Sequence, residues 1–185
     1  MIAYPPKNKK ELSELIEMEQ KLYCPKESYK KHIFRHSKAY ALFRALKAFR
    51  VHEYYALNHR GSSIVRLFLE RRCNLLCEKV GLELTAGKVA PGIKLYHSQI
   101  VLNGYVGENC IFHGNNMIGN KRTGARDEVP HIGNNVDVGY GAVIIGNVTI
   151  ADHCVIGAGA VVTKSFEAPG SIIAGVPARL VTKNE

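Results

Sequence analysis

The 185-residue sequence has no long hydrophobic run, and its first residues lack an apolar core. A segment that spans a bilayer needs about 20 apolar residues, and a secretory signal needs an apolar stretch near the N-terminus. Residues 1–12 are instead polar and rich in lysine. We therefore expect a cytoplasmic protein without a membrane-spanning segment.

Cysteine is sparse and irregularly spaced. An odd number without the spacing of a disulfide framework predicts reduced thiols. Two of the cysteines lie four positions apart with no histidine pair to complete a metal site, so we interpret them as helix packing and predict no bound metal. The cysteines are Cys24, Cys73, Cys77, Cys110 and Cys154.

Sequence motifs of several enzyme classes are also missing. The chain has neither a P-loop nor the Gly-x-Ser-x-Gly turn of serine hydrolases. Two Gly-x-Gly segments, residues 139–141 and 157–159, could suggest nucleotide loops. Glycine at the corners of a repeat explains them better, because corners need backbone conformations that other residues disfavour.

Positive charge is concentrated in one part of the chain. Residues 1–80 hold 17 Lys and Arg against 8 Asp and Glu, whereas residues 81–185 hold 8 of each. The excess suggests a surface for anionic membrane lipid, at the inner face of the membrane, or for an acidic substrate. Solvated helix faces explain it as well. Nucleic acid is not expected, because no binding motif is present.

The N-terminal part of the chain, up to position 80, has the pattern of helices. Apolar residues recur at helical spacing over residues 8–22. A second helical stretch begins near residue 27 or 28 and is clearest over 39–57, and a third covers 63–80. A stop followed by an N-cap is expected at residues 59–63. Composition changes near residue 80, so we predict a helical region at 1–80 and a second domain at 81–185.

The second domain is built on a hexapeptide repeat. Neither a helix, with a period of 3.6, nor a plain strand, with a period of 2, gives a strict period of six over this stretch. The hexapeptide period predicts a parallel β-helix, in which three hexapeptides form one coil. Coils of this class are left-handed. The aliphatic positions are Ile132, Val138, Ile144, Ile150, Ile156 and Val162, and a small residue follows four places later at Val136, Ala142, Val148, Cys154 and Ala160.

An earlier repeat block precedes this one, at Ile100, Val106, Phe112 and Ile118. The step from Ile118 to Ile132 exceeds two hexapeptides by two positions. We interpret the polar, glycine-containing residues 119–130 as a loop that leaves the coil. Loops on a rigid solenoid often carry function.

Four segments together resemble a known family, the hexapeptide-repeat acyltransferases. The closest branch is serine acetyltransferase-like and includes acetyltransferases of bacterial surface polysaccharides, and the resemblance covers about residues 81–181. The segments are GIKLYHSQIV (92–101), IGNNVDVGYGAVIIG (132–146), IGAGAVVTK (156–164) and AGVPAR (174–179).

The resemblance implies an acetyltransferase with acetyl-CoA as co-substrate. His97 occupies the place of the general base, and Glu83 is the candidate for the acid that orients it, although the spacing is one position short. His113 and His131 are the reserve candidates for the base. The resemblance also implies a homotrimer with active sites between subunits. Residues that match the CoA site are Tyr140, Ala158, Thr163, Lys164 and Arg179, with Lys183 as a further candidate.

The acceptor positions depart from the serine acetyltransferase pattern. Tyr96 stands where those enzymes carry aspartate, and residues 128–130 (Glu-Val-Pro) stand where they carry an Arg-His pair. A pocket for free serine needs charged partners for its ammonium and carboxylate. We therefore expect a saccharide hydroxyl, from a surface polysaccharide or its precursor, as acceptor. Serine O-acetylation in cysteine biosynthesis is the alternative, and a non-catalytic scaffold or metal-binding, hydratase-like β-helix is a second one.

Overall fold

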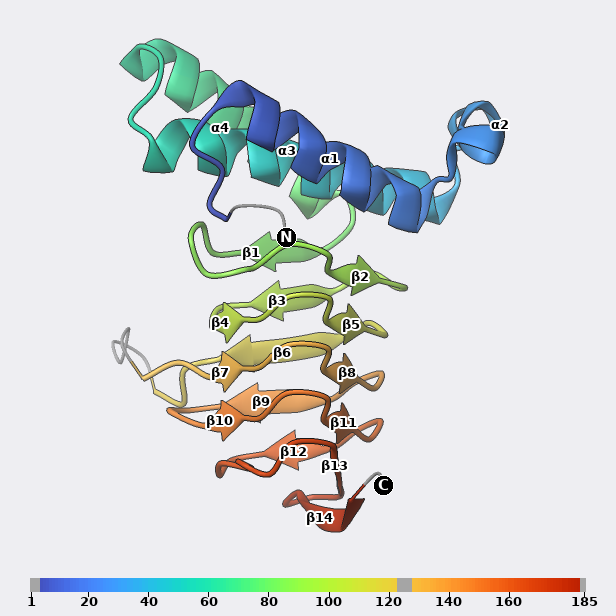
Figure 1. The fold of residues 1–185 in the computed structure, drawn as a ribbon, viewed down its shortest axis with the longest axis vertical. Helices are drawn as coiled ribbons and strands as arrows, with labels where there is room; N and C mark the ends of the chain where they lie inside the picture. Colours follow the sequence, from blue (N-terminus) through green and yellow to red (C-terminus); the bar gives the residue numbers. More distant parts are fainter. Residues whose placement is uncertain (1–3, 123–127, 184–185) are drawn as a thin grey trace. The chain divides into compact units, whose positions relative to one another are not determined.

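The chain consists of two compact units, Met1–Leu82 and Glu83–Glu185 (Figure 1). The structure is a computed structural model that describes residues 4–122 and 128–183. The first unit is helical and the second is built from short strands.

The longer helices of the first unit each begin at a side-chain N-cap. Asn8, Ser37 and Ser62 are N-caps whose side chains accept hydrogen bonds from backbone N–H groups of the first turn. The predicted cap near residues 59–63 is thus confirmed. Within the described part of the chain, every helix falls short of the length and apolar content that crossing a membrane requires. The elements are α1 (Lys9–Tyr23), the 3-10 turn η1 (Lys26–Ser28), α2 (Tyr29–Phe34), α3 (Lys38–Leu57) and α4 (Ser63–Glu78).

The core of this unit contains a buried charge cluster that the sequence reading did not anticipate. Arg50 of α3 is 0% exposed; its guanidinium donates to Glu19 of α1 at 2.8 Å and to Glu53 at 3.1 Å. Tyr4 adds a hydrogen bond to Glu53 at 2.8 Å. Burial opposes the charge on Arg50, but Glu19 and Glu53 outweigh it and raise the pKa of the guanidinium above its ordinary value. The cluster ties α1 to α3 through paired charges.

The second unit is a coil of short strands stacked into three sheets (Figure 1). The first sheet has the order β1-β3-β6-β9-β12, the second β10-β7-β4 and the third β14-β13-β11-β8-β5-β2. The determined pairs are parallel except that β14 runs antiparallel to β13. The strands are β1 (Leu82–Leu84), β2 (Lys94–Leu95), β3 (Ile100–Leu102), β4 (Tyr105–Val106), β5 (Ile111–Phe112), β6 (Asn116–Gly119), β7 (His131–Ile132), β8 (Asp137–Val138), β9 (Val143–Ile145), β10 (Thr149–Ile150), β11 (Val155–Ile156), β12 (Val161–Val162), β13 (Ser171–Ala174) and β14 (Arg179–Lys183).

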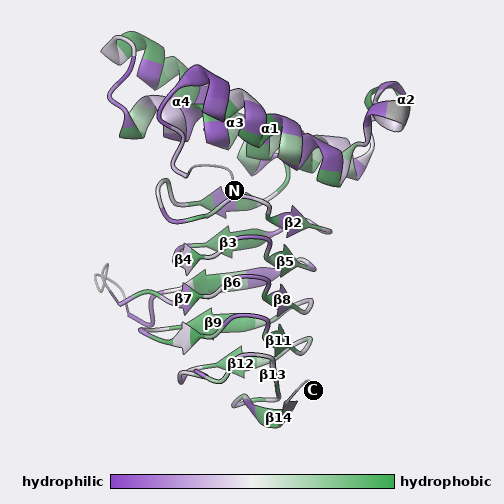
Figure 2. Cartoon of the chain, viewed as in Figure 1, coloured by the Kyte–Doolittle hydropathy of each residue, from purple (hydrophilic) through white to green (hydrophobic). Residues whose placement is uncertain are grey.

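The hexapeptide interpretation is confirmed by the strand register. Ile132 pairs with Ile150, Val138 with Ile156 and Ile144 with Val162, so each coil comprises three hexapeptides, one in each sheet. These aliphatic residues are buried, and so are the small residues four places after them. Figure 2 accordingly shows hydrophobic residues on the strands and many hydrophilic ones on the helices. The aliphatic side chains of successive coils stack on one another and form the core of the coil.

The loop lies where it was predicted, between β6 and β7, but the predicted number of hexapeptides across it is wrong. Ile118 lies in the first sheet and Ile132 in the second, so the whole segment between them replaces a single hexapeptide. The coil that joins Val106 to its partner Ile132 is therefore eight positions longer than the regular coil from Ile132 to Ile150. The sequence count had indicated an excess of only two. Residues 123–127 of this loop lie outside the described residues.

Candidate active site

His97 lies at the corner between β2 and β3, with an exposed side chain. The register of the third sheet aligns Leu95, Phe112, Val138 and Ile156 in successive coils. Two positions after each of these, the corners therefore hold His97, Gly114, Tyr140 and Ala158 in one column, which we call the His97 column.

Glycine at position 114 is what leaves room for His97. Gly114 has φ +117°, and a Cβ added there would overlap the Cβ of His97 and lie 3.2 Å from its Cα. The imidazole therefore lies over a residue without a side chain. Asn116, 2% exposed, fixes this corner: it accepts from the Gly114 N–H at 2.9 Å and donates to the Gly139 carbonyl at 2.8 Å.

Tyr140 is the aromatic neighbour of His97 in this column. The two rings meet edge to face, with centroids 6.1 Å apart and planes 84° apart. Both side chains are exposed, so a substrate can reach either one from the corner. The contact joins the predicted base to one of the predicted CoA positions.

A second histidine, His113, has a carboxylate partner that the sequence reading missed. Its Nε2 lies 2.9 Å from Oδ1 of Asp137, and the ring of Tyr96 stacks on it at 5.2 Å. Both members of the pair are about 40% exposed, so water screens the interaction, and its contribution to stability is under ~1 kcal/mol. Only the strand register of the structure reveals this pair, because Ile111 pairs with Asp137 and His113 points to the same side.

Glu83 lies on an exposed position of β1, in the first sheet, whereas His97 follows β2 of the third sheet. The other reserve base, His131 of β7, stacks on Tyr105 with centroids 4.6 Å apart. It lies in the second sheet, away from the His97 column. The pairing of Glu83 with His97 stays a prediction.

The predicted CoA residues fall into two groups. Tyr140 and Ala158 belong to the His97 column, where the Gly159 N–H donates to the Tyr140 carbonyl at 2.9 Å. Thr163 and Lys164 follow β12 of the first sheet, and both side chains are exposed. The Nζ of Lys164 lies 5.5 Å from the ring centroid of Phe166.

The last two predicted CoA residues belong to β14. Arg179 begins this strand, has an exposed side chain and pairs with Ala174. The backbone of Lys183 pairs with Ser171, and its side chain lies outside the described part of the chain. The structure thus puts part of the predicted site in one column with His97 and the rest on neighbouring segments of the later coils.

The two Gly-x-Gly segments are confirmed as corners of the coil. A Cβ added to Gly139 would lie 2.6 Å from the backbone nitrogen of Ala158 in the next coil, and one added to Gly157 would lie 2.9 Å from the Cβ of Ala174. Glycine is needed at both places because successive coils approach closely.

All five cysteines are buried, and none of them forms a disulfide within the described part of the chain. Cys73 and Cys77 lie on α4 with their sulfur atoms 3.9 Å apart. Among the residues that the structure describes, no group of three or more His, Cys, Asp or Glu could hold a metal ion.

Comparison with known proteins bears on the hexapeptide repeat and on the family that it resembles. Residues 130–164 match the family described as "Bacterial transferase hexapeptide (six repeats)". The chain is 32% identical over 148 residues to serine acetyltransferase of Escherichia coli, covering 76% of this chain and 51% of that protein. It is 33% identical over 155 residues to mitochondrial serine acetyltransferase 3 of Arabidopsis thaliana, covering 81% of this chain and 37% of the relative. The chain thus spans about half or less of the length of these two relatives.

Solved structures share the fold. Soybean serine acetyltransferase superposes with a TM-score of 0.70 at 24% identity, over 92% of this chain and 69% of the other. The Brucella abortus serine acetyltransferase in complex with coenzyme A superposes with a TM-score of 0.69 at 21% identity, over 96% and 70% of the two chains. At these identities the likeness concerns the fold, with its helical region and hexapeptide coils.

The expectation of a saccharide acceptor is contradicted by these comparisons. The similar proteins and structures are consistently serine acetyltransferases, and none of those given above is a polysaccharide acetyltransferase. The departures at Tyr96 and residues 128–130 had suggested a sugar, because they remove charged partners of a free amino acid. These departures concern a few positions, whereas the similarity to serine acetyltransferases extends over 76–81% of the chain, so we give the similarity more weight in assigning the acceptor.

Proposed function

We propose that this hexapeptide-repeat protein, which belongs with the serine acetyltransferase-like branch of the acyltransferases, is an acetyl-CoA-dependent serine O-acetyltransferase. The observation that carries the proposal is the His97 column. It holds an exposed imidazole next to the ring of Tyr140, with Ala158 further along the same column, in a chain that resembles serine acetyltransferases.

In the proposed reaction His97 is the general base. A ring nitrogen with a free lone pair accepts the proton of the serine hydroxyl. The hydroxyl oxygen attacks the thioester carbonyl of acetyl-CoA. The tetrahedral intermediate then breaks its carbon–sulfur bond, and the imidazolium returns the proton to the departing sulfur. The products are O-acetylserine and CoA.

The orientation of the imidazole is assigned to Glu83, as the resemblance implies. An acid that accepts from the far ring nitrogen would fix the tautomer and stabilise the imidazolium. Close packing of His97 on Gly114 supports a fixed ring position. The pair of His113 and Asp137 is the competing acid–base pair, and the variant His113→Asn tests it.

The co-substrate is assigned to the edge of the coil. Backbone groups of Tyr140, Ala158 and Thr163 would hold the pantetheine arm, since exposed corners and small residues let it approach the backbone. Lys164 and Arg179 would meet the phosphates of CoA, with Lys183 as a further candidate from the resemblance. The acetyl-CoA site and its phosphate contacts lie on the later coils, while the base lies on an earlier one.

Assembly as a homotrimer is part of the proposal. The outward positions of the first sheet carry an apolar row, namely Val101, Met117, Val143 and Val161, of which Met117 is 51% exposed. Covering this row with a neighbouring subunit would remove apolar area from water. We also assign a left-handed winding to the coil, from the resemblance. The sequence suggests a cytoplasmic location.

The acceptor contacts must differ in detail from those of other serine acetyltransferases. Tyr96 stacks on His113, and Glu128 forms an exposed ion pair with Arg122 at 3.4 Å. Because the aspartate and the Arg-His pair are replaced, we expect the KM for serine to be higher than that of the Escherichia coli relative.

The test is release of the CoA thiol by the full chain from acetyl-CoA, with and without L-serine. We expect serine-dependent release that falls at least ~10²-fold in His97→Asn, the usual scale for a general base. His153→Asn is the matched control, because His153 is an exposed corner histidine with φ +61°, which asparagine tolerates. If thiol release with serine does not exceed the rate without it, serine is refuted as the acceptor. Loss in His113→Asn but not in His97→Asn would move the base to His113.

A further inference from the structure

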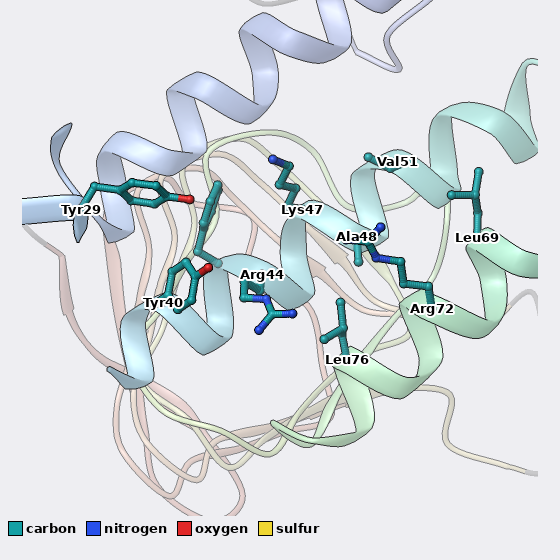
Figure 3. Close-up of a pocket in the computed structure, with 10 residues that line it drawn as sticks. Tyr29, Tyr40, Arg44, Lys47, Ala48, Val51, Leu69, Arg72 and Leu76 are labelled. Atoms are coloured by element: carbon teal, nitrogen blue, oxygen red, sulfur yellow. The ribbon is translucent and has the colours of Figure 1, made fainter. Parts of the chain in front are cut away.

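A cavity of about 470 Å³ opens between α3 and α4, entirely within the helical unit (Figure 3). Its apolar lining comes from side chains such as Val51, Leu69 and Leu76. Its polar lining consists of Tyr29, Tyr40, Arg44, Lys47 and Arg72. Among the described residues no carboxylate lines it, so the cavity combines an apolar floor with three positive charges.

The three cations are available to a ligand. Arg44, Lys47 and Arg72 are exposed, and in the part of the chain that the structure describes none of them pairs with a carboxylate. The guanidinium of Arg44 lies 5.8 Å from the ring centroid of Tyr40, which orients it toward the cavity. Uncompensated cations around an apolar floor select an anion that carries an apolar body.

The cavity continues along α4 as a second hollow of about 460 Å³, which shares Arg44, Arg72 and Leu76 with the first. Beside these hollows α4 presents large apolar side chains to solvent. Ile64 is 81% exposed, Leu67 66% and Phe68 64%. At helical spacing, positions 64, 68, 71, 75 and 79 share one face, which holds Ile64, Phe68, Arg71, Leu75 and Lys79.

This face of α4 is amphipathic with a positive rim. Helix α4 carries two acidic residues, Glu70 and Glu78, and neither lines a hollow; at helical spacing Glu78 lies next to Arg71 and Glu70 lies away from this face. Such a pattern, apolar residues flanked by arginine and lysine, is typical of helices that lie in the interface of an anionic membrane. A soluble partner of negative charge would match the cations but would leave Ile64 and Phe68 without apolar contact.

We propose that the α3–α4 face binds an anionic phospholipid surface. A head-group phosphate lies in the cavity between Arg44, Lys47 and Arg72, and Ile64, Leu67 and Phe68 insert among the upper acyl carbons. Charge complementarity fixes the occupant, because the helical residues 1–80 carry the whole net excess of +9. The proposal goes beyond acetyl transfer and does not depend on it.

The test is flotation of the full chain with lipid vesicles. We expect binding to vesicles of phosphatidylcholine with phosphatidylglycerol, little binding to phosphatidylcholine alone, and a decline as salt rises. Each lysine or arginine near such a surface contributes a factor of about five in partitioning, so the double variant Arg44→Gln/Arg72→Gln should weaken binding ~25-fold. The control Arg35→Gln/Arg60→Gln removes the same charge from exposed residues that line neither hollow, and should have a smaller effect.

The apolar part is tested separately with Ile64→Ser/Phe68→Ser, which changes only exposed side chains. Reduced vesicle binding, together with an unchanged oligomeric mass in light scattering, supports insertion. Lower oligomeric mass with unchanged vesicle binding would show that the face contacts a second copy and would overturn the proposal. Equal losses in the two arginine pairs, or full displacement from vesicles by millimolar glycerol phosphate, would overturn it as well. Because each readout is binding or mass, failure here leaves the acetyltransferase proposal intact.

Discussion

Replacement of Gly114 by alanine is the sharpest test of how the coil positions His97. The added Cβ would meet the Cβ of His97 closer than the 3.0 Å that real Cβ atoms respect, and would lie 3.2 Å from its Cα and 3.4 Å from its carbonyl carbon. These atoms belong to or adjoin the backbone, so a rotamer change of His97 cannot relieve the contact. Carbon atoms pack at about 3.5–4.0 Å, so the corner must open.

The magnitude follows from two separate costs. Alanine at φ +117° carries backbone strain of about 1–3 kcal/mol, and overpacking of the corner adds about 1–3 kcal/mol. Asn116 ties the Gly114 N–H to the next coil, so the displacement passes to His97 rather than being absorbed locally. A shift of about 1 Å in a reacting group costs about 10² in rate.

The matched control is Gly146→Ala. Gly146 also has positive φ, +92°, but its added Cβ would meet nothing closer than the Cβ of Lys121 at 3.7 Å. This variant should carry the strain without the clash. Denaturant unfolding and thiol release are measured on both variants. We expect Gly114→Ala to be the less stable and about 100-fold slower, with the KM for acetyl-CoA little changed. Turnover of Gly114→Ala within twofold of the control would refute the idea that a missing side chain holds His97 in place.

Three further predictions concern the ion cluster, a buried thiol and the co-substrate. Glu19→Ala leaves Arg50 with an incomplete set of buried partners and should lower the free energy of unfolding by about 3–5 kcal/mol, whereas Glu17→Ala, at an exposed ion pair, should change the urea midpoint little. Burial raises the pKa of Cys110 to about 12. Between about pH 9 and pH 12 the thiol ionises only in the unfolded state, so the free energy of unfolding falls as pH rises, by up to about 1.4 kcal/mol per pH unit. Urea titrations of Cys110→Ala should lack this loss. Arg179→Ala should weaken acetyl-CoA binding in calorimetry without changing the oligomeric mass. An unchanged affinity would refute the contact of Arg179 with the CoA phosphates.

Much of the fold could be predicted from the sequence because the signals are local. The period of six in residues 132–162 places a buried aliphatic in every strand, and the side chain of Ser62 caps α4 through a contact within one turn. The loop was misjudged because the step from Ile118 to Ile132 resembles two hexapeptides with two extra positions. Only the assignment of Ile118 and Ile132 to consecutive sheets shows that a single hexapeptide is replaced. Composition carries no information on which sheet a given repeat joins.

The candidate site shows the same division between local and remote information. His97 could be singled out because the segment around it resembles a family motif. The pair of His113 and Asp137 could not, because the two residues are far apart in sequence and the inserted loop between them shifts the register by eight positions. The structure also separates the two histidines chemically. Asp137 engages a ring nitrogen of His113 and Tyr96 covers one ring face, whereas His97 shares its column with Tyr140 and Ala158.

A base for acyl transfer must reach both the acceptor hydroxyl and the thioester in one geometry. In the proposed site the His97 column would meet this need, because position 114 lacks the side chain that would otherwise stand between His97 and Tyr140. His113 occupies the neighbouring column, where Gly139 follows it, and its contact to Asp137 draws the ring along the strand direction of β8. We therefore favour His97 over His113 as the proposed base. Because the missing side chain at position 114 leaves room for His97, we expect Gly114→Ala to affect turnover more than co-substrate affinity.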